Sequence, residues 1–458
     1  MSTFQIINTA LSGLIANQQA LEVTSHNITN ANTDGYHRQA VKLASATLNG
    51  DVSNLGSFTS PLGTGVDVVT VKRMQDVFLQ QQTRQSMAQS GRWDSASTTL
   101  SQLESALSPT TDTNLSTTLD NFFNAWQSFA NNPEDQSGRL SVRSSAENLT
   151  NFINSTVTDL NAIVSDIDSN LKSRVNDVNN LAETIAKQNV IIVNGQAQGI
   201  SVNDILDQRD QSMMELTKLT GATAHITDDG AAYIGMDGKM LVQGTLPNRV
   251  GMVSDLSGSK IVWADDNSEI KISTGEIGGL LESRNTIVPS FHTQLDNVAF
   301  TLSNTINNLH RQGINPAGDT SINFFTGTTA ADIRVSDSVM NDVNSIASTR
   351  IAGASGDGSL ATEISDLYRK PLIGSSTLNQ ASNAIITQVG TAMQNAKTNS
   401  DASNALTKQL LTQEKSTSGV SLDEELTNML LYQRSYDASA KVLSTADEML
   451  KTLIDRLG

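Results

Sequence analysis

The sequence predicts a mainly α-helical, elongated molecule that is folded like a hairpin and carries a small inserted β domain. Two patterns lead to this fold class: long amphipathic segments occupy both ends of the chain, and short β-rich runs interrupt the helical pattern near its middle. The length of 458 residues also exceeds what one hydrophobic core usually serves, so we expect two or three domains.

The N-terminal segment predicts a coiled-coil helix. Apolar residues recur at steps of three and four between Phe4 and Ile28, with polar interruptions at Gln18 and Ser25, and this spacing places them along one helical seam. Asn, Asp and Gly then dominate positions 30–35, where they favour a helix end. The assembly seam predicted for this end consists of Leu11, Leu14, Leu21 and Ile28.

The C-terminal segment repeats the same spacing without a break. Ser421 and Glu424 have the spacing of a capping box, which predicts the start of the helix. The seam predicted here consists of Leu422, Leu426, Met429, Tyr436, Leu443, Leu450, Ile454 and Leu457. Because long amphipathic seams are unstable when exposed, we expect the two terminal helices to pack on each other, with the middle of the sequence at the far tip.

Between the ends, strand and helix patterns alternate. The segments 38–48 and 65–71 flank a Gly, Ser and Asn stretch with Pro61, which predicts an extended hairpin. Helical periodicity is strongest from Leu140 to Gln188. Further helices are predicted over residues 119–129, 279–310 and 378–414.

A composition change near Asn194 marks the inserted β domain. Short β-rich runs alternate with Gly and Asp turns up to Thr274, including Asp228-Asp229-Gly230 and Asp237-Gly238. Residues 315–365 are Gly-rich and mixed, and their pattern predicts no regular element. The predicted domains are a terminal coiled coil (1–37 and 416–458), a helical body (38–190 and 280–415) and an outer β domain (191–279).

Composition excludes several classes of partner and chemistry. The formal net charge is −17, whereas nucleic acids and anionic membrane surfaces attract Lys and Arg clusters. The chain has no cysteine, which excludes disulfides, zinc–thiolate sites and thiol nucleophiles. No apolar run is long enough for a membrane span. The N-terminus lacks the pattern of a cleavable signal peptide, since no Lys or Arg precedes Arg38.

The search for catalytic, cofactor-binding and metal-binding motifs predicts none. The five histidines are far apart in sequence, and we expect each at the surface or in an interface. Residues 166–170 begin like a calcium loop, but Leu171 stands where the turn needs Gly, so a solvated helix is favoured. The segments 235–239 and 353–358 lack the spacing of phosphate-binding and dinucleotide-binding loops. We therefore expect no enzyme and no cofactor.

Both ends of the chain resemble the flagellar rod, hook and hook-associated protein family. At the N-terminal end the resemblance is carried by residues 10–14, 18–21, 25–28 and 30–38, with the motif residues Asn27, Asn30, Gly35, Tyr36 and Arg38. At the C-terminal end it is carried by residues 418–425 and 431–436. Three internal pieces favour the hook-associated branch: 121–123, 206–210 (Leu-Asp-Gln-Arg-Asp) and 274–281.

This resemblance implies a structural adaptor segment between the flagellar hook and filament. The paired terminal helices would form an inner tube, the helical body the next shell, and the β domain an outward projection. Implied partners are copies of the chain, the hook protein, a second hook-associated protein on the filament side, and an export chaperone on the C-terminal helix. The protein would leave the cell as an uncleaved monomer through the flagellar type III channel and become extracellular.

Two other functions remain open from the sequence. A hook protein or distal rod protein would share both terminal patterns, although the long helical stretch and the piece at 206–210 argue against it. A secreted surface adhesin or hydrolase would use the β domain to bind a glycan. That function needs an exposed aromatic platform, and the only aromatic residues there are Tyr233 and Trp263, which we expect in a core.

Overall fold

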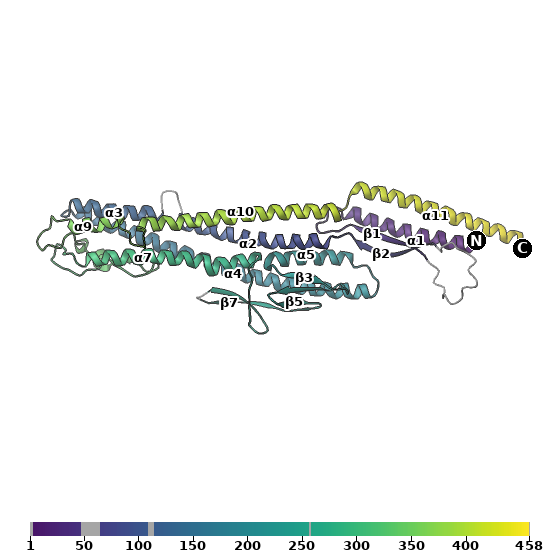
Figure 1. Ribbon diagram of the computed structural model, residues 1–458, viewed down its shortest axis with the longest axis horizontal. Helices are drawn as coiled ribbons and strands as arrows, with labels where there is room; N and C mark the ends of the chain where they lie inside the picture. The colour runs from purple at the N-terminus through teal and green to yellow at the C-terminus, as the bar shows by residue number, and fades with distance from the viewer. Residues whose placement is uncertain (1–2, 47–64, 109–113, 256–257, 458) are drawn as a thin grey trace.

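The computed structural model describes residues 3–46, 65–108, 114–255 and 258–457, and it shows a long rod with both chain termini at one end (Figure 1). Helices dominate, and a small region of sheets lies against one side, which confirms the predicted fold class. Leu48 and the stretch around Pro61 lie outside the described residues.

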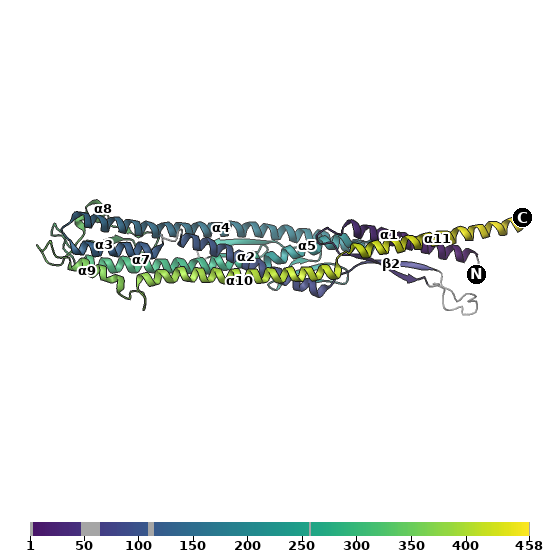
Figure 2. The same cartoon turned by 90° about the horizontal axis from the view of Figure 1, so that it is seen from above.

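The two ends of the chain pack on each other, as predicted. Helix α1 (Thr3–Thr29) lies beside α11 (Leu422–Leu457), and these two helices are called the terminal pair below (Figures 1 and 2). Strands β1 (Gln39–Ser45) and β2 (Val66–Arg73) form an antiparallel hairpin against α1, with a bulge between Lys42 and Leu43. In Figure 1 this hairpin and α11 lie on opposite sides of α1.

A bundle of long helices, called the shaft, continues from the terminal pair. Its helices are α2 (Val77–Leu107), α3 (Leu115–Asn131), α4 (Gln136–Ala197), α5 (Asn203–Thr220), α6 (Gly275–Glu282), α7 (Val288–His310) and α10 (Leu378–Ser418), with a π-helical turn over Ser283–Ile287 between α6 and α7. A buried stripe along α4, including Leu149, Ile153, Leu160, Ile167 and Leu171, explains its length, because helical stability comes mainly from packing an apolar face.

Two small antiparallel sheets lie beside α4 and α5. One has the order β3-β4-β5-β6, with strands Thr223–Ile226, Ala232–Met236, Lys239–Gln243 and Leu246–Pro247. The other has the order β7-β8-β9, with strands Val250–Asp255, Gly258–Trp263 and Glu269–Ile270. Positive φ angles at Gly230, Asp237 and Gly238 build the predicted turns. Trp263 is buried, and the sheets share one continuous core with the shaft.

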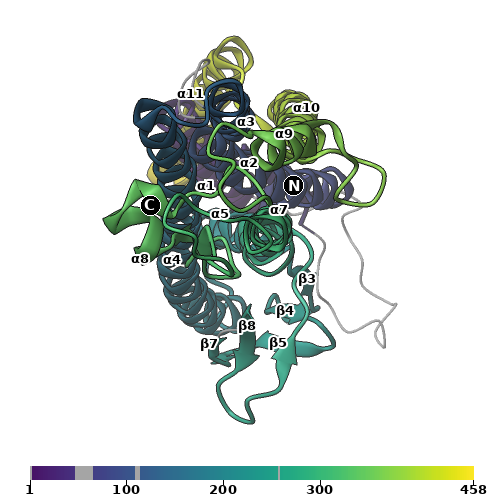
Figure 3. The ribbon, with the colours of Figure 1, turned by 90° about the vertical axis from the view of Figure 1, so that its left-hand side faces the viewer.

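The far tip is made by residues 310–377 and the ends of the shaft helices, not by the middle of the sequence (Figures 1 and 3). It contains the strand pair β10 (Phe325–Thr326) and β11 (Arg334–Val335), helices α8 (Asp337–Asn341) and α9 (Ser359–Asp366), and single 3-10 turns at Val343–Ser345 and Leu367–Arg369. Buried Phe324 and Phe325 pack against Phe122 of α3.

The expectation that the middle of the sequence lies at the tip was wrong because α4 is longer than the predicted helix. Its 62 residues span about 90 Å at 1.5 Å per residue. The chain therefore returns along the whole shaft before α5 and the sheets begin, and α5 starts near the terminal pair (Figure 1).

Candidate functional site

The family-motif residues gather where the terminal pair meets the shaft, a region called the joint below. Asn27 is buried at the end of α1, and its side-chain nitrogen donates to the carbonyl of Gln39 (2.8 Å) and to Glu425 Oε2 (3.0 Å). Its side-chain oxygen accepts from the backbone N–H of Gln39 (2.9 Å) and from the Tyr36 hydroxyl (2.7 Å). One buried amide therefore ties α1, the β1–β2 hairpin and α11 together.

Arg38 completes this connection, and Asn27, Tyr36, Arg38 and Glu425 are called the latch. The Arg38 Nε donates to Glu425 Oε1 at 2.7 Å, and its Nη1 lies 3.1 Å from Glu424 Oε2. The Glu425 side chain is 2% exposed, whereas that of Glu424 is 64% exposed. The Arg38 N–H also donates to the carbonyl of Ser418 (2.8 Å), which fixes the end of α10.

Two further motif residues shape the loop that enters the latch. Gly35 has a φ of +78°, and a Cβ atom there would lie 2.6 Å from Gln211 Nε2, so another residue would be strained in its backbone and would displace the Gln211 side chain. Asn30 donates to the carbonyl of His26 (3.1 Å) just after α1 ends. Burial, followed by the charges of Asp204, Asp207 and Glu425, raises the pKa of Tyr36, so its hydroxyl stays protonated and can donate to Asn27.

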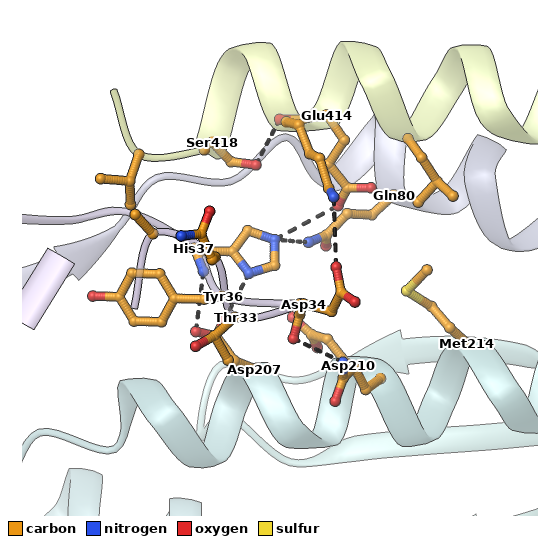
Figure 4. Close-up of a pocket in the computed structure, with 18 of the residues that line it drawn as sticks. Thr33, Asp34, Tyr36, His37, Gln80, Asp207, Asp210, Met214, Glu414 and Ser418 are labelled. Atoms are coloured by element: carbon orange, nitrogen blue, oxygen red, sulfur yellow. Dashed lines mark hydrogen bonds and ion pairs between the residues drawn. The ribbon is translucent and has the colours of Figure 1, made fainter. Parts of the chain in front are cut away.

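A second group, called the His37 cluster, joins the same loop to three shaft helices (Figure 4). The Nδ1 of buried His37 lies 2.7 Å from Asp207 Oδ1 of α5. On the other side of the ring, Nε2 lies 3.0 Å from Gln80 Nε2 of α2 and 3.6 Å from Glu414 Oε1 of α10. Arg73 at the end of β2 also binds Asp207, and it donates to Asp210 at 2.9 Å.

These contacts decide the charge of His37. Burial lowers the pKa of His37, but the hydrogen bond to Asp207 and the nearby Glu414 carboxylate outweigh burial and raise it to about 9. A protonated ring donates from both nitrogens, so the Gln80 amide turns its oxygen towards Nε2, and the ring is then a positive charge between carboxylates of two different helices. Such an arrangement holds α5 and α10 at a fixed separation beside the loop.

The joint is expected to loosen at alkaline pH. The folded-state pKa of His37, about 9, lies above the ordinary value of 6.5, so its contribution is complete below about pH 6.5 and is lost as the pH rises through 9. We expect about 2–3 kcal/mol of stability to disappear over that range. Thermal unfolding of the wild type and of His37→Gln at pH 6.5 and 9.5 measures it. A wild type that loses no more stability than His37→Gln would contradict this.

A cavity of about 470 Å³ lies beside the His37 cluster. Its lining combines the loop at 31–37 with side chains from α2, α5 and α10, among them Arg84, Met214 and Leu411. Burial lowers the pKa of Arg84, although the charges of Asp210 and Glu414 oppose this shift. The arrangement is that of a structural connection between helices, since its charged groups mainly pair with one another.

The histidine expectation was wrong for two positions. His37 is buried in the joint, and His310 is buried in the tip, where its Nε2 accepts from the backbone N–H of Ala347 (3.1 Å). Burial lowers the pKa of His310 to about 4, despite its contact with the carbonyl of Ile322. By contrast, His225 is exposed, and His26 and His292 are half-buried.

Sequence reasoning also missed several members of the joint. Glu425 and Asp207 lie in pieces that carry the family resemblance, but Arg73, Gln80 and Glu414 lie in none of them. Their partners are far away in sequence, as with His37 and Glu414. A lone charged residue on a helix gives no local signal of such a contact.

The predicted seam and the packing face of the terminal pair are different sets of residues. Small side chains of α1 are buried in the single chain, where α1 packs against α11 and the β1–β2 hairpin, namely Ala10, Ala16 and Ala20. At Gly13 an added Cβ would lie 3.0 Å from Ser439 Oγ of α11, so the helices approach closely there. In α11, Glu425 and Ala446 are the buried residues among those whose side chains the structure describes.

The seam residues themselves are mostly accessible in the single chain. Leu11, Leu422, Leu426, Tyr436 and Ile454 are exposed, whereas Leu14, Leu21, Ile28, Met429, Leu443 and Leu450 are half-buried. The side chain of Leu457 lies outside the described residues. The seam therefore stays a prediction as an assembly surface.

Neither a metal site nor a membrane-spanning helix is found in the described parts of the chain. No group of three or more His, Asp or Glu side chains there could hold a metal ion. Residues 166–170 lie within α4, where Asp168 binds Arg284 at 3.1 Å. None of the described helices is sufficiently long and apolar to cross a bilayer.

The fold and the joint define a class of protein: an elongated structural subunit whose chain ends form a paired helical element. Three sequence families match the chain. The flagellar hook-associated protein FlgK helical domain matches residues 100–325, the flagellar basal body rod FlgEFG protein C-terminal family matches 416–456, and the flagella basal body rod protein family matches 7–37.

Individual relatives match over nearly their whole length. The flagellar hook-associated protein 1 of Bacillus subtilis (strain 168) is 29% identical, with 100% of this chain and 99% of the relative covered. That of Escherichia coli (strain K12) is 28% identical, covering 98% and 99%. The chain belongs to the flagellar hook-associated protein 1 family and is a structural component of the bacterial flagellum, where it assembles with other flagellar components.

A solved structure supports the same fold. The flagellar hook junction protein FlgK from Burkholderia pseudomallei superimposes with a TM-score of 0.65 at 14% identity, covering 74% of this chain and 100% of that chain. The alignments with the B. subtilis and E. coli relatives extend over 509 and 549 positions, more than the 458 residues here. These relatives therefore carry segments that this chain lacks.

Proposed function

We propose that this protein is the adaptor segment that joins the flagellar hook to the filament. The observation that carries the proposal is the alignment of 98–100% of the chain with relatives named flagellar hook-associated protein 1. The terminal families alone also fit rod proteins, but the helical family at 100–325 distinguishes this chain from them. That match favours the junction over the hook and distal rod alternatives.

The terminal pair is the proposed inner assembly element. Large apolar side chains on both of its helices are exposed in the single chain, including Leu11, Ile15, Leu426 and Leu430. Contiguous exposed apolar surface marks a site of protein association. The proposed neighbours are copies of this chain, the hook protein on one side and a second hook-associated protein on the other.

The remaining features of the proposal follow the same division of the chain. Residues 1–37 and 416–458 form the inner tube, 38–190 and 280–415 the surrounding helical body, and 191–279 an outward β domain. The subunit is exported as a monomer, while a chaperone covers the exposed apolar face of α11. At its extracellular site, the hook–filament junction, it has a structural role and catalyses no reaction. Trp263 is buried and Tyr233, which we expected in a core, is half-buried, so neither offers the exposed aromatic platform that an adhesin would need.

Deletion of the gene tests the adaptor function. Cells without the protein should complete their hooks, fail to retain filaments, and release flagellin into the medium. The physical reason is that hook and filament subunits need a segment with a compatible face for each. Electron microscopy of the cells, with flagellin measured in the medium, gives the result.

The alternatives give different outcomes in the same experiment. Loss of the hook itself would indicate a hook or rod protein, and normal swimming would indicate an adhesin. Restoring the gene on a plasmid is the control, and it should restore filaments. Filament-bearing cells without the gene or a second copy of it would overturn the proposal.

A further inference from the structure

The β1–β2 hairpin and the start of α2 carry exposed basic and apolar side chains, called the α2 surface: Lys42, Lys72, Met74, Val77 and Phe78. Lys42 pairs across the hairpin with Thr70, and Lys72 with Ala40, so both lysines lie on one face of the β1–β2 hairpin. Both are exposed and belong to none of the ion pairs found among the described residues.

The apolar part of the α2 surface follows directly in the chain. Met74, Val77 and Phe78 are exposed, Phe78 by 68%. Val77 and Phe78 lie on the face of α2 opposite to buried Leu79 and Thr83. A protruding aromatic side chain flanked by unpaired lysines is typical of a contact surface.

The base of α11 carries the complementary surface, called the α11 surface: Leu422, Asp423, Leu426 and Leu430. The three leucines are four residues apart and are each about half exposed, 46% at Leu426 and 54% at Leu430. The stripe turns away from the side of α11 that holds buried Glu425 and Ala446. The Asp423 carboxylate is exposed and takes part in no ion pair of the described residues.

Both surfaces begin at the joint: the α2 surface covers part of the hairpin and the first turn of α2, and the α11 surface covers the first turns of α11 (Figure 1). Arg38 contacts the chain next to both surfaces. Its carbonyl accepts from the Met74 N–H (2.8 Å), and its guanidinium binds Glu425 (2.7 Å). The β1–β2 hairpin lies on one side of α1, and α11 lies on the other (Figure 1). Within one chain, α1 therefore lies between the hairpin that carries the two lysines and the helix that carries Asp423.

We propose that the α2 surface of one copy docks on the α11 surface of the next copy in the assembled flagellum. Phe78 and Met74 pack against the leucine stripe, and the hairpin lysines face Asp423. The contact joins two different patches, and repeating such a contact generates rings or helical arrays. Opposite charges on the two sides fix the register and disfavour contacts between like surfaces. The inference rests on the proposed function, since both require copies to assemble side by side.

Cysteine cross-linking tests the contact, because the chain has no cysteine of its own. Phe78→Cys and Leu426→Cys are expressed together in one strain, and isolated flagella are oxidised. We expect a covalent dimer of this chain from the mixture and none from either variant alone. Phe300→Cys, an exposed aromatic position on α7 (50% exposed, against 68% for Phe78), replaces Phe78→Cys as the control and should give no dimer.

The outcomes separate this contact from the adaptor function. Filament-bearing cells whose mixed flagella give no dimer would overturn the contact and leave the adaptor function standing. A dimer from Phe78→Cys alone would also overturn it, because it indicates contact between like surfaces. Filaments in a strain that lacks the gene would overturn the adaptor function itself.

Charge reversal provides a test that does not depend on the cysteine variants assembling. Lys72→Glu and Asp423→Lys, both at exposed positions, should each lower the number of filaments per cell about tenfold. Both changes in one chain should restore at least half of the filaments, because every contact then carries the reversed pair. Lys397→Glu on α10, another exposed lysine, is the matched control. A double variant no better than the single variants would overturn the proposal.

Discussion

Glu425→Ala is expected to release the base of α11 from the joint and to abolish stable filaments. The side chain of Glu425 is 2% exposed and receives hydrogen bonds from Asn27 and Arg38. Removing one partner of a buried charged pair costs about 3–5 kcal/mol. Arg38 is 26% exposed and regains some hydration, so we expect about 2–3 kcal/mol here. Hydrogen exchange of residues 422–440 in the purified protein measures the loss.

The neighbouring carboxylate supplies a matched control. Glu424 pairs with the same guanidinium at 3.1 Å, but its side chain is 64% exposed. Surface pairs contribute about 0–1 kcal/mol, so Glu424→Ala should leave exchange in α11 and the number of filaments nearly unchanged. Equal effects of the two substitutions would show that burial of Glu425 in the latch is unimportant.

The sequence predicted the elements of this molecule better than their contacts. Leucine spacing located both terminal helices. The β-rich runs located the sheets, but the range predicted for the β domain from Asn194 also holds the end of α4 and all of α5. The spacing of apolar residues indicates that one face of a helix is covered. It does not indicate whether the same chain or a neighbouring copy covers that face. In the single chain, Ala16 and Ala20 of α1 are buried while Leu11 and Leu426 are accessible, which fits a division between contacts within one copy and contacts between copies.

The joint could be predicted only in part. The resemblance pointed to Asn27, Gly35, Tyr36 and Arg38, and the structure brings them to one place. The residues that complete their contacts come from distant parts of the chain, as Glu425 does for Asn27 and Asp207 for His37. Such pairings depend on how the long helices lie next to one another, which local patterns do not encode.

The tip could not be predicted from the sequence for a different reason. Residues 315–365 contain only short elements, such as β10 and α8, so no periodicity could develop. Their order comes instead from buried aromatic contacts, with the Phe324 and Phe325 rings 4.8 Å apart beside Trp126. Side-chain hydrogen bonds also contribute, since Asn307 Oδ1 accepts from the backbone of both phenylalanines.

The latch and the His37 cluster act on different parts of the same joint. The latch binds α11 to α1 and to the hairpin, whereas His37 binds the loop between α1 and β1 to α5 and α10. The direction of the terminal pair relative to the shaft therefore depends on both. An adaptor between two different packing geometries needs this direction to be fixed, because inner and outer contacts with its neighbours must form together.

Substitutions along α11 should have two different effects. At half-buried positions they should destabilise the free protein, and at exposed positions they should prevent assembly only. Leu443 is half-buried and lies on the same face of α11 as Ser439, which contacts Gly13, and as buried Ala446. A carboxylate there loses hydration without gaining a partner, so Leu443→Asp should destabilise the terminal pair by about 2–3 kcal/mol and abolish filaments. Leu450→Asp, one heptad further, should do the same.

Leu430→Asp should abolish filaments without disturbing the terminal pair of the free protein. Leu430 is 54% exposed in the single chain, so a carboxylate there remains hydrated until a neighbouring copy covers it. Hydrogen exchange of α11 in the purified variants separates the two effects: protection should fall in Leu443→Asp and stay at the wild-type level in Leu430→Asp, while the shaft remains protected in both. Normal filaments with Leu430→Asp, or unchanged protection with Leu443→Asp, would contradict this division of the seam.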